Sequence, residues 1–173
     1  MATKPRITVY PTSANPPTWG HADIMMRAAK RFDKLLWVIA SNPRKINPEF
    51  SVEEKIKMMQ SYVKYYNLEN VEVVDCQGAV VRLAKERGAQ FLLRGLRNTS
   101  DFQMELELAA GNRGIDKNIE TICMFSKPHF ATISSSLVRE LAILGEKIDQ
   151  YVLPSLVPLI QKKLNLSSKR KSK

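Results

Sequence analysis

The sequence predicts an α/β protein with a doubly wound, five-stranded parallel sheet and helices on both of its faces. Short apolar runs alternate with helical patterns along the chain, which is typical of parallel strands joined by crossover helices. The run over residues 35–40 is continuously apolar, as expected of a strand that is covered on both faces. With 173 residues, of which 44% are hydrophobic, the chain suits one domain with one core.

The elements are expected in alternating order. The apolar runs predict strands at residues 7–10, 35–40, 71–74, 91–93 and 121–125. Helical spacing of apolar residues predicts helices at 21–32, 51–66, 79–87, 102–112, 135–144 and 154–164. The second helix starts with a capping-box pattern, in which Ser51 and Glu54 satisfy each other's backbone amides. The third and fifth helices end at Gly88 and Gly145, and glycine suits a left-handed cap.

We expect one nucleotide-handling domain over residues 1–166 and a disordered basic tail over 167–173, because the tail is polar and has nothing apolar to bury. The chain has 27 Lys and Arg against 17 Asp and Glu, a net charge of +10 that favours anionic partners such as phosphates. A good part of this excess lies in the C-terminal tail. No basic stretch is rich in aromatic residues, so a solvated tail is favoured over an arm that binds nucleic acid.

Composition also narrows the location and the metal chemistry. No apolar run is long enough to cross a bilayer, and no signal-peptide pattern is present, so we expect a cytoplasmic protein without a membrane partner. The two cysteines and two histidines are Cys76, Cys123, His21 and His129. They are too few and too scattered for a structural zinc site, and we expect no metal bound by protein side chains.

The loop after the first strand combines small hydroxyl residues with a Gly20-His21 pair that opens a helix. The N-terminus of a helix presents unpaired amides and a partial positive charge, which together bind anions. His21 would add a hydrogen-bond donor at the same place. The alternative is that Thr18 is only a helix cap and His21 a surface residue, and this segment alone leaves both interpretations open.

Two later loops point to the same chemistry. Arg94 and Arg97 follow a buried strand, at the edge of the sheet where ligands bind, and their planar guanidinium groups suit phosphate oxygens. This position favours phosphate binding over a pair of solvated charges. The three consecutive serines of residues 134–136 open a helix, although one serine would suffice as a cap. We expect Arg139, one turn further on, to be structural, paired with Glu140 or another neighbour.

The absence of other motifs excludes several classes of enzyme. No G-x-x-x-x-G-K-[ST] segment is present, which argues against a P-loop kinase or ATPase. No G-x-G-x-x-G follows the first strand, which argues against a dinucleotide oxidoreductase. No arrangement of a Ser or Cys nucleophile with His is indicated. Catalysis by positioning and charge neutralisation therefore fits better than covalent catalysis.

Together these residues resemble bacterial phosphopantetheine adenylyltransferases, over nearly the whole chain from Arg6 to about residue 164. Three segments carry the resemblance, in order and at similar spacings: Tyr10-Pro11 with Thr18-Trp19-Gly20-His21, Arg94-Gly95-Leu96-Arg97 with Asp101-Phe102, and the stretch ISSSLVRE at 133–140. T-x-G-H and the serine loop mark a wider nucleotidyltransferase superfamily with Rossmann-like domains. The R-G-L-R segment is specific to this family.

The resemblance implies transfer of AMP from ATP to 4′-phosphopantetheine, giving dephospho-coenzyme A and pyrophosphate in coenzyme A biosynthesis, with Mg²⁺ accompanying ATP. It implies His21 and Lys45 as the catalytic residues, His21 stabilising the transition state and Lys45 holding the attacking phosphate. It implies that the acceptor substrate is contacted by Ser13, Lys45, Val80 and Arg94. It implies that ATP is contacted by Ser13, Ala14, His21, Gly95, Leu96, Arg97, Glu105, Phe130, Ala131, Thr132, Ile133, Ser134, Ser135 and Ser136. It also implies a homo-oligomer, which in this family is a hexamer.

The chain departs from the family pattern at three places. The family's Gly-Thr-Phe-Asp-Pro in the first loop is replaced by Thr-Ser-Ala-Asn-Pro at residues 12–16. The loop around Lys45 is about two residues longer, so Arg44 is an alternative phosphate ligand. Ala79-Val80 is a smaller pair than expected. The alternatives are therefore a nicotinate or nicotinamide mononucleotide adenylyltransferase, a cytidylyltransferase, a nucleotide binder without catalysis, and a nucleic-acid binder.

Overall fold

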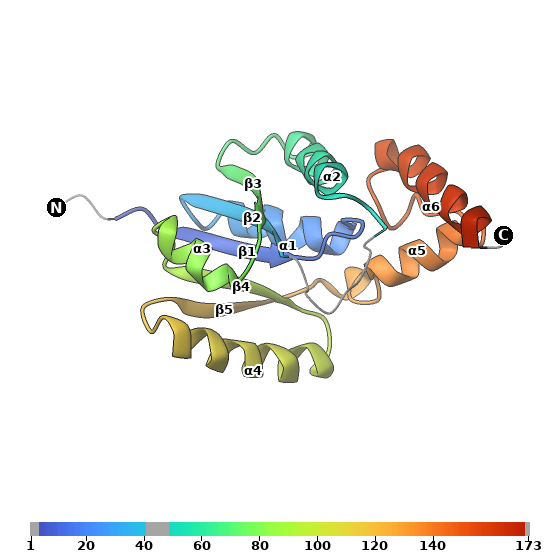
Figure 1. Cartoon of the computed structure of the whole chain (residues 1–173). Coiled ribbons are helices and arrows are strands. Elements are labelled where there is room, and N and C mark those ends of the chain that lie inside the picture. The colour runs from blue at the N-terminus through green and yellow to red at the C-terminus, as the bar shows by residue number, and fades with distance from the viewer. Residues whose placement is uncertain (1–3, 41–48, 172–173) are drawn as a thin grey trace.

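The structure, a computed structural model, describes residues 4–40 and 49–171. Its strands form one parallel sheet with the order β3-β2-β1-β4-β5, which confirms the predicted five-stranded parallel sheet (Figure 1). The strands are β1 (Ile7–Thr12), β2 (Lys34–Ala40), β3 (Val71–Cys76), β4 (Phe91–Leu96) and β5 (Glu120–Phe125). The strand order reverses direction between the neighbours β1 and β4, so the carboxyl ends of these two strands form the switch point where ligands bind in such sheets.

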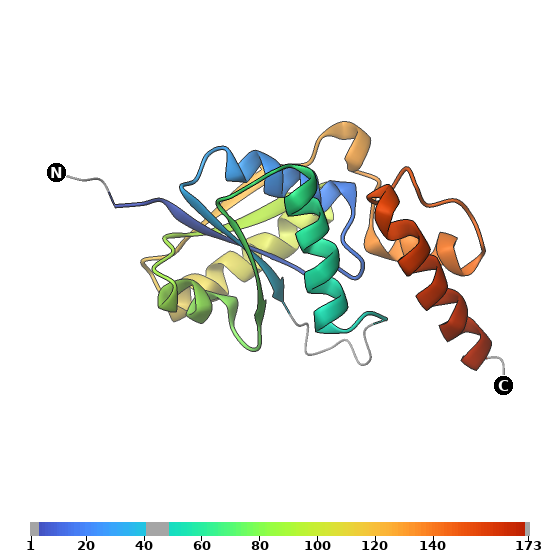
Figure 2. The same ribbon diagram turned by 90° about the horizontal axis from the view of Figure 1, so that it is seen from above.

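Helices follow every strand. They are α1 (Trp19–Ala29), α2 (Val52–Tyr65), α3 (Val80–Glu86), α4 (Thr99–Ile115), α5 (Ser135–Ile143) and α6 (Val157–Lys171), with short 3₁₀ helices η1 (Pro128–Phe130) and η2 (Pro154–Leu156). Helices α5 and α6 lie side by side at one end of the molecule, as both views show (Figures 1 and 2). This end of the fold supplies the serine loop.

The sheet is covered on both faces, and its interior strand β2 is apolar at every position after Lys34. In β2, Leu35, Trp37 and Ile39 point into a core shared with α1, α2, α5 and α6, whereas Leu36 and Val38 point into a second core shared with α3. All five side chains are fully buried or nearly so. The continuous apolar run therefore has the meaning predicted for it.

The predicted caps are confirmed. The Ser51 backbone N–H donates to Glu54 Oε2 over 2.7 Å, and the Glu54 N–H donates to Ser51 Oγ over 3.3 Å. Gly88 and Gly145 follow their helices with φ values of +66° and +82°, a conformation that favours glycine.

Two strands, β4 and β1, extend beyond their predicted ends, which changes where residues of the site lie. Strand β4 extends through Leu96, so Arg94 and Gly95, which we expected in a loop, lie inside a strand and pair with Cys123 and Met124 of β5. The apolar run stops at Leu93, and the arginine and glycine that follow it do not indicate a strand, so the prediction ended the strand too early. The same is true of β1, whose polar Thr12 pairs with Ile39 of β2.

The C-terminal tail also differs from the prediction. Helix α6 continues through Lys171, so residues 167–171 of the expected disordered tail are helical, whereas 172–173 lie outside the described residues. The physical reason is that no glycine or proline follows Pro158 within the helix, and most of the residues after it are leucine, lysine and arginine, which favour helix once α6 has started.

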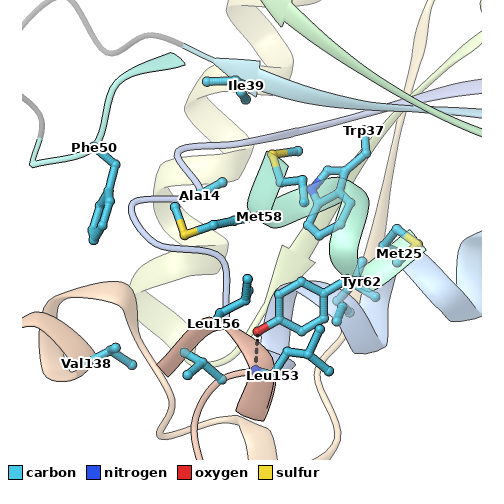
Figure 3. Close-up of a cluster of buried hydrophobic side chains, with 14 of the residues drawn as sticks. Ala14, Met25, Trp37, Ile39, Phe50, Met58, Tyr62, Val138, Leu153 and Leu156 are labelled. Carbon is cyan, nitrogen blue, oxygen red and sulfur yellow. Dashed lines mark hydrogen bonds between the residues drawn. The ribbon is translucent and has the colours of Figure 1, made fainter. Parts of the chain in front are cut away.

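Tyr62 of α2 joins the larger core to the segment that precedes α6. Its ring lies edge-on to Trp37, with ring centroids 6.3 Å apart. Its hydroxyl accepts the backbone N–H of Leu153 over 2.9 Å (Figure 3) and donates to the carbonyl of Pro17 over 3.3 Å. One buried side chain thus ties the first loop and the C-terminal helices to the same core.

Candidate active site

A cavity of about 270 Å³ opens at the carboxyl ends of β1 and β4, where the topology places a ligand site. It lies between the loop after β1, the start of α1, the first two turns of α4 and the N-terminus of α5. The residues that line it are Tyr10, Pro11, Thr12, Ser13, Thr18, Gly20, His21, Ile24, Arg94, Gly95, Arg97, Asp101, Met104, Glu105, Ser126, Ile133, Ser134, Ser135, Ser136 and Arg139.

The cavity brings together most of the residues singled out from the sequence. Those that line it are Ser13, His21, Arg94, Gly95, Arg97, Glu105, Ile133, Ser134, Ser135 and Ser136. Others do not line it: Ala14, Val80, Leu96, Phe130, Ala131 and Thr132. Ala14 and Leu96 are buried in the protein interior, and Val80 packs against the core under α3. Lys45 and its alternative Arg44 lie outside the described residues.

His21 has a fixed tautomer. The backbone N–H of Thr18, the N-cap residue of α1, donates to His21 Nδ1 over 3.1 Å, and Thr18 Oγ1 lies 2.9 Å from the same nitrogen. Because Nδ1 accepts an N–H, the ring proton of neutral His21 is on Nε2. Within the part of the chain that the structure describes, Nε2 has no protein partner, so this N–H can serve a ligand in the cavity. Both earlier interpretations hold in part: Thr18 is a cap, and His21 faces the site.

The histidine is also held neutral. Burial lowers the pKa of His21 to about 4, and the nearby positive charge of Arg97 adds to the shift. At neutral pH the ring is therefore a hydrogen-bond donor through Nε2 without a charge of its own. The hydrogen bond from such a neutral donor strengthens as negative charge develops on a phosphate oxygen during a reaction.

Arg94 reaches the cavity already paired. Its Nη2 donates to Glu105 Oε1 over 2.6 Å and its Nε donates to Glu105 Oε2, a bidentate ion pair with a buried carboxylate. Its Nη1 lies 3.4 Å from the carbonyl of Pro11. Glu105 is the one side chain of α4 that is buried in the described chain, so this pair fixes α4 against β4.

Arg97 is paired in the same manner, with Asp101, which lies one turn before Glu105 on α4. Its Nε donates to Asp101 Oδ2 over 3.0 Å, and Nη2 donates to Oδ1 over 3.2 Å. The backbone N–H of Arg97 also donates to Asp101, and Asn98 caps the start of α4 by accepting the Asp101 N–H. The spacing of four residues between Arg97 and Asp101 is a signal that sequence reasoning could have used.

The serine loop does structural work with its hydroxyls and leaves its amides to a ligand. Ser134 Oγ accepts the N–H of Leu137 as the cap of α5, and Ser135 Oγ donates to the carbonyl of Pro16 over 2.7 Å. The amides of Ser135 and Ser136 are the first of the helix and have no partner within it. They point to an anion site at the helix N-terminus made by backbone groups more than by hydroxyls.

Arg139 is structural, as expected, and of the two alternatives, Glu140 or another neighbour, the structure shows the second. Its Nη1 donates to the carbonyl of Asn15 over 2.5 Å and its Nη2 to Ser136 Oγ over 3.3 Å, so it does not pair with Glu140. The arginine, which lines the cavity, thereby joins α5 to the first loop.

Comparison with known proteins identifies the family. Residues 9–141 match the Cytidylyltransferase-like family. A phosphopantetheine adenylyltransferase from Lachnoclostridium phytofermentans is 39% identical over 160 residues, which cover 92% of this chain and 96% of that protein. Another from Carboxydothermus hydrogenoformans is 43% identical over 140 residues, covering 81% and 85%. The chain belongs to the phosphopantetheine adenylyltransferase family. This confirms the resemblance seen in the motifs.

Solved structures show the fold of this adenylyltransferase family member. The crystal structure of a putative nicotinate-nucleotide adenylyltransferase from Vibrio parahaemolyticus superimposes with a TM-score of 0.69 at 19% identity, covering 93% of this chain and 95% of that one. The predicted Rossmann-like α/β fold is confirmed. At that identity the similarity concerns the fold, and the acceptor must be argued from the site.

Two further properties of the described residues bear on partners. No group of three or more His, Cys, Asp or Glu side chains is placed to hold a metal ion within 4–40 and 49–171. Among the described helices, none is long and apolar enough to span a membrane. Sequence reasoning gave no role to Ser126, which lines the cavity from the turn after β5 and carries no motif that would have revealed it.

The neutral state of His21 can be tested by NMR in a His129→Gln variant, which leaves His21 as the single histidine. We expect its ring signals to stay in the neutral position at pH 6.5 and to titrate near pH 4. The unfolded chain protonates near 6.5 and the folded one near 4, so this group makes folding less favourable as the pH falls from about 6.5 to 4. A midpoint near 6.5 in the folded protein would contradict the buried, neutral ring.

Proposed function

We propose that this protein is a phosphopantetheine adenylyltransferase, which transfers AMP from ATP to 4′-phosphopantetheine and releases pyrophosphate. One observation carries the proposal: a neutral histidine N–H, two arginines and the N-terminus of α5 converge on one cavity at the switch point of the sheet. Relatives named for this activity are 37–43% identical over most of the chain. Donors aimed at phosphate oxygens suit transfer of a phosphate-linked group without a covalent intermediate.

The chemistry needs no protein nucleophile. A phosphate oxygen of the acceptor attacks the α-phosphorus of ATP, a new P–O bond forms, and the bond to the β-phosphate breaks as pyrophosphate leaves. Negative charge grows on the oxygens around the α-phosphorus, and the His21 Nε2–H would donate to one of them. Because this bond strengthens as charge develops, it lowers the barrier more than it strengthens ATP binding.

The other residues divide the two substrates between them. Arg94, Ser13, Val80 and Lys45 would hold the acceptor, with Lys45 offsetting the repulsion between the attacking phosphate and ATP. The nucleotide would lie against the assigned residues that line the cavity, Gly95, Arg97, Glu105 and 133–136. Ala14 and Leu96 are buried, so they would support these residues rather than contact the nucleotide. Among these, the amides that open α5 would bind ATP phosphates, whereas Glu105 would accept from the nucleoside.

Magnesium would enter with ATP and be held largely by phosphate oxygens and water. The described residues do not fit a dedicated magnesium cage, because the two cavity carboxylates, Asp101 and Glu105, are each already engaged by an arginine. The reaction would take place in the cytoplasm, and the two free thiols, Cys76 and Cys123, suit a reducing compartment.

The function is tested by pyrophosphate release from ATP and magnesium with three acceptor conditions: 4′-phosphopantetheine, nicotinate mononucleotide and none. We expect release with 4′-phosphopantetheine alone. Release with the mononucleotide alone would keep the chemistry and reject the acceptor. No release with any acceptor, in a protein that still binds ATP, would make the protein a nucleotide binder.

The role of His21 predicts a specific kinetic pattern. His21→Ala should lower kcat roughly 10³-fold, because it removes a donor to the transition state, and should change the Kd for ATP by no more than about twofold. His21→Gln, whose amide can place an N–H near the position of Nε2, should retain more turnover than the alanine variant. His129→Gln is the matched control and should keep normal turnover. Near-normal kcat in His21→Ala would reject the assignment.

We also propose that the protein is a homo-oligomer, a hexamer by family resemblance, assembled through α4 and the edge strand β5. Five apolar side chains of α4 are 45–54% exposed, and Phe125 of β5 is 74% exposed. The five are Phe102, Met104, Leu106, Leu108 and Ile115. A helix that is apolar on several sides is expected to be buried, and a second copy of this chain would cover it.

Sedimentation velocity tests this surface. We expect the wild type to sediment as an oligomer and Leu106→Asp as a smaller species, because a carboxylate in an apolar interface is costly. Leu144→Asp, an exposed apolar residue at the end of α5, is the matched control and should leave the assembly intact. A wild type that is monomeric at micromolar concentration would contradict the proposal.

A further inference from the structure

Asp23 is a buried carboxylate that none of the roles above uses. It lies on α1, two residues after His21, and its side chain is 1% exposed. Residues two apart on a helix point to different sides, and Asp23 does not line the cavity. A buried charge is costly unless cations and hydrogen bonds surround it, so its presence needs an explanation.

Two cations meet Asp23 from different directions. Arg27, one turn along α1, donates from Nη1 to Oδ2 over 2.9 Å. Lys127 comes from the turn after β5, with its Nζ 3.4 Å from Oδ1. That contact is an ion pair without hydrogen-bond geometry, and Oδ1 has no hydrogen-bond donor among the described residues. The same Nη1 of Arg27 also donates to the carbonyl of Phe125 over 2.8 Å.

These contacts join α1 to the chain segment that leaves β5. Arg27 holds the last residue of β5 by its carbonyl, and Lys127 begins the turn that becomes η1, where its carbonyl accepts the N–H of Phe130 over 2.9 Å. The Asp23–Lys127 pair is the side-chain ion pair that the structure gives this turn. The backbone adds a bond from the N–H of Ser126 to the carbonyl of Leu96 over 2.8 Å.

The segment so anchored forms a wall of the cavity. Ser126 and Ile133, at its two ends, both line the cavity. The carbonyls of Phe130 and Ile133 lie close to Gly20 on α1, 3.6 Å and 3.9 Å from where a Cβ would stand. A displacement of Lys127 would therefore move the wall relative to the helix that carries His21.

We propose that Asp23 is a positioning residue for the nucleotide side of the site: through Lys127 and Arg27 it sets the distance between the start of α1 and the segment 126–133. The inference rests on the proposed function only in taking this cavity as the ATP site. Asp23 touches neither substrate, and its effect passes through the wall that it holds.

The test measures ATP affinity by calorimetry, with magnesium and without an acceptor, in the full chain. Lys127→Met is the principal variant, because Lys127 is 48% exposed and its loss leaves the Asp23–Arg27 pair intact. We expect Lys127→Met and Asp23→Asn each to weaken ATP binding about tenfold, since a loosely supported site loses affinity. Lys127→Arg, which keeps the charge, should retain near-normal affinity.

A double-mutant cycle separates positioning from direct contact. The Asp23→Asn/Lys127→Met double variant should bind ATP no more weakly than Asp23→Asn alone, because Lys127 then has nothing to hold. In steady state the KM for ATP should rise in Lys127→Met, while the KM for the acceptor and kcat stay within about twofold. Arg113→Met is the matched control and should bind ATP normally. Arg113 forms an exposed ion pair with Glu120 of β5, the strand that leads to Lys127.

Two outcomes would overturn the proposal. Unchanged ATP affinity in both Asp23→Asn and Lys127→Met would show that the pair does not support the site. Fully additive losses in the double variant would show that Lys127 acts on ATP by its own charge rather than through Asp23. Neither depends on pyrophosphate release, so the proposed function can fail while this test stays decisive.

Discussion

The geometry of the site depends on how the loop after β1 is held. Three consecutive backbone carbonyls, those of residues 15–17, accept hydrogen bonds from the side chains of Arg139, Ser135 and Tyr62. Prolines occupy two of these positions and have no N–H, so the carbonyls are the groups through which the loop can be fixed. The loop leads directly into the N-cap of α1, and the orientation of His21 follows from it. Residues of α2 and α5, far from His21 in the sequence, thereby determine the orientation of its imidazole ring.

The charged side chains of the cavity are likewise held by partners from another element. Each arginine of β4 and its following turn is matched by a carboxylate from α4, at Asp101 and Glu105. The pairs fix the orientation of the planar guanidinium groups before any ligand arrives, because a bidentate partner removes most of their freedom. An anionic ligand then meets oriented donors, although part of their charge is already balanced. His21 complements them as a donor that carries no charge, since burial keeps it neutral.

The sequence was sufficient for the fold, and the cavity gathers most of the residues that it singled out; what it could not predict has physical reasons. The spacing of apolar residues and the capping of helices depend on residues close together in the sequence. The strands, the Ser51–Glu54 capping box and the cap at Gly88 could therefore be predicted. Which carboxylate meets Arg94, or that Ser135 spends its hydroxyl on the carbonyl of Pro16, depends on packing between elements that no local pattern encodes. The end of β4 was missed for a related reason: pairing with β5 continues past the last apolar residue.

The contacts that hold the first loop do not depend on the side chains by which it departs from the family pattern. The hydrogen bonds that fix it run to backbone carbonyls, which any residue supplies, so replacing the family's side chains leaves them in place. Asn15 adds a contact of its own, accepting the N–H of Phe50 with Oδ1 over 3.3 Å. Ala14 of this loop is fully buried with a φ of +43°, a conformation that is unfavourable for alanine by about 1 kcal/mol. A residue without glycine's freedom keeps that conformation because the surrounding contacts determine it.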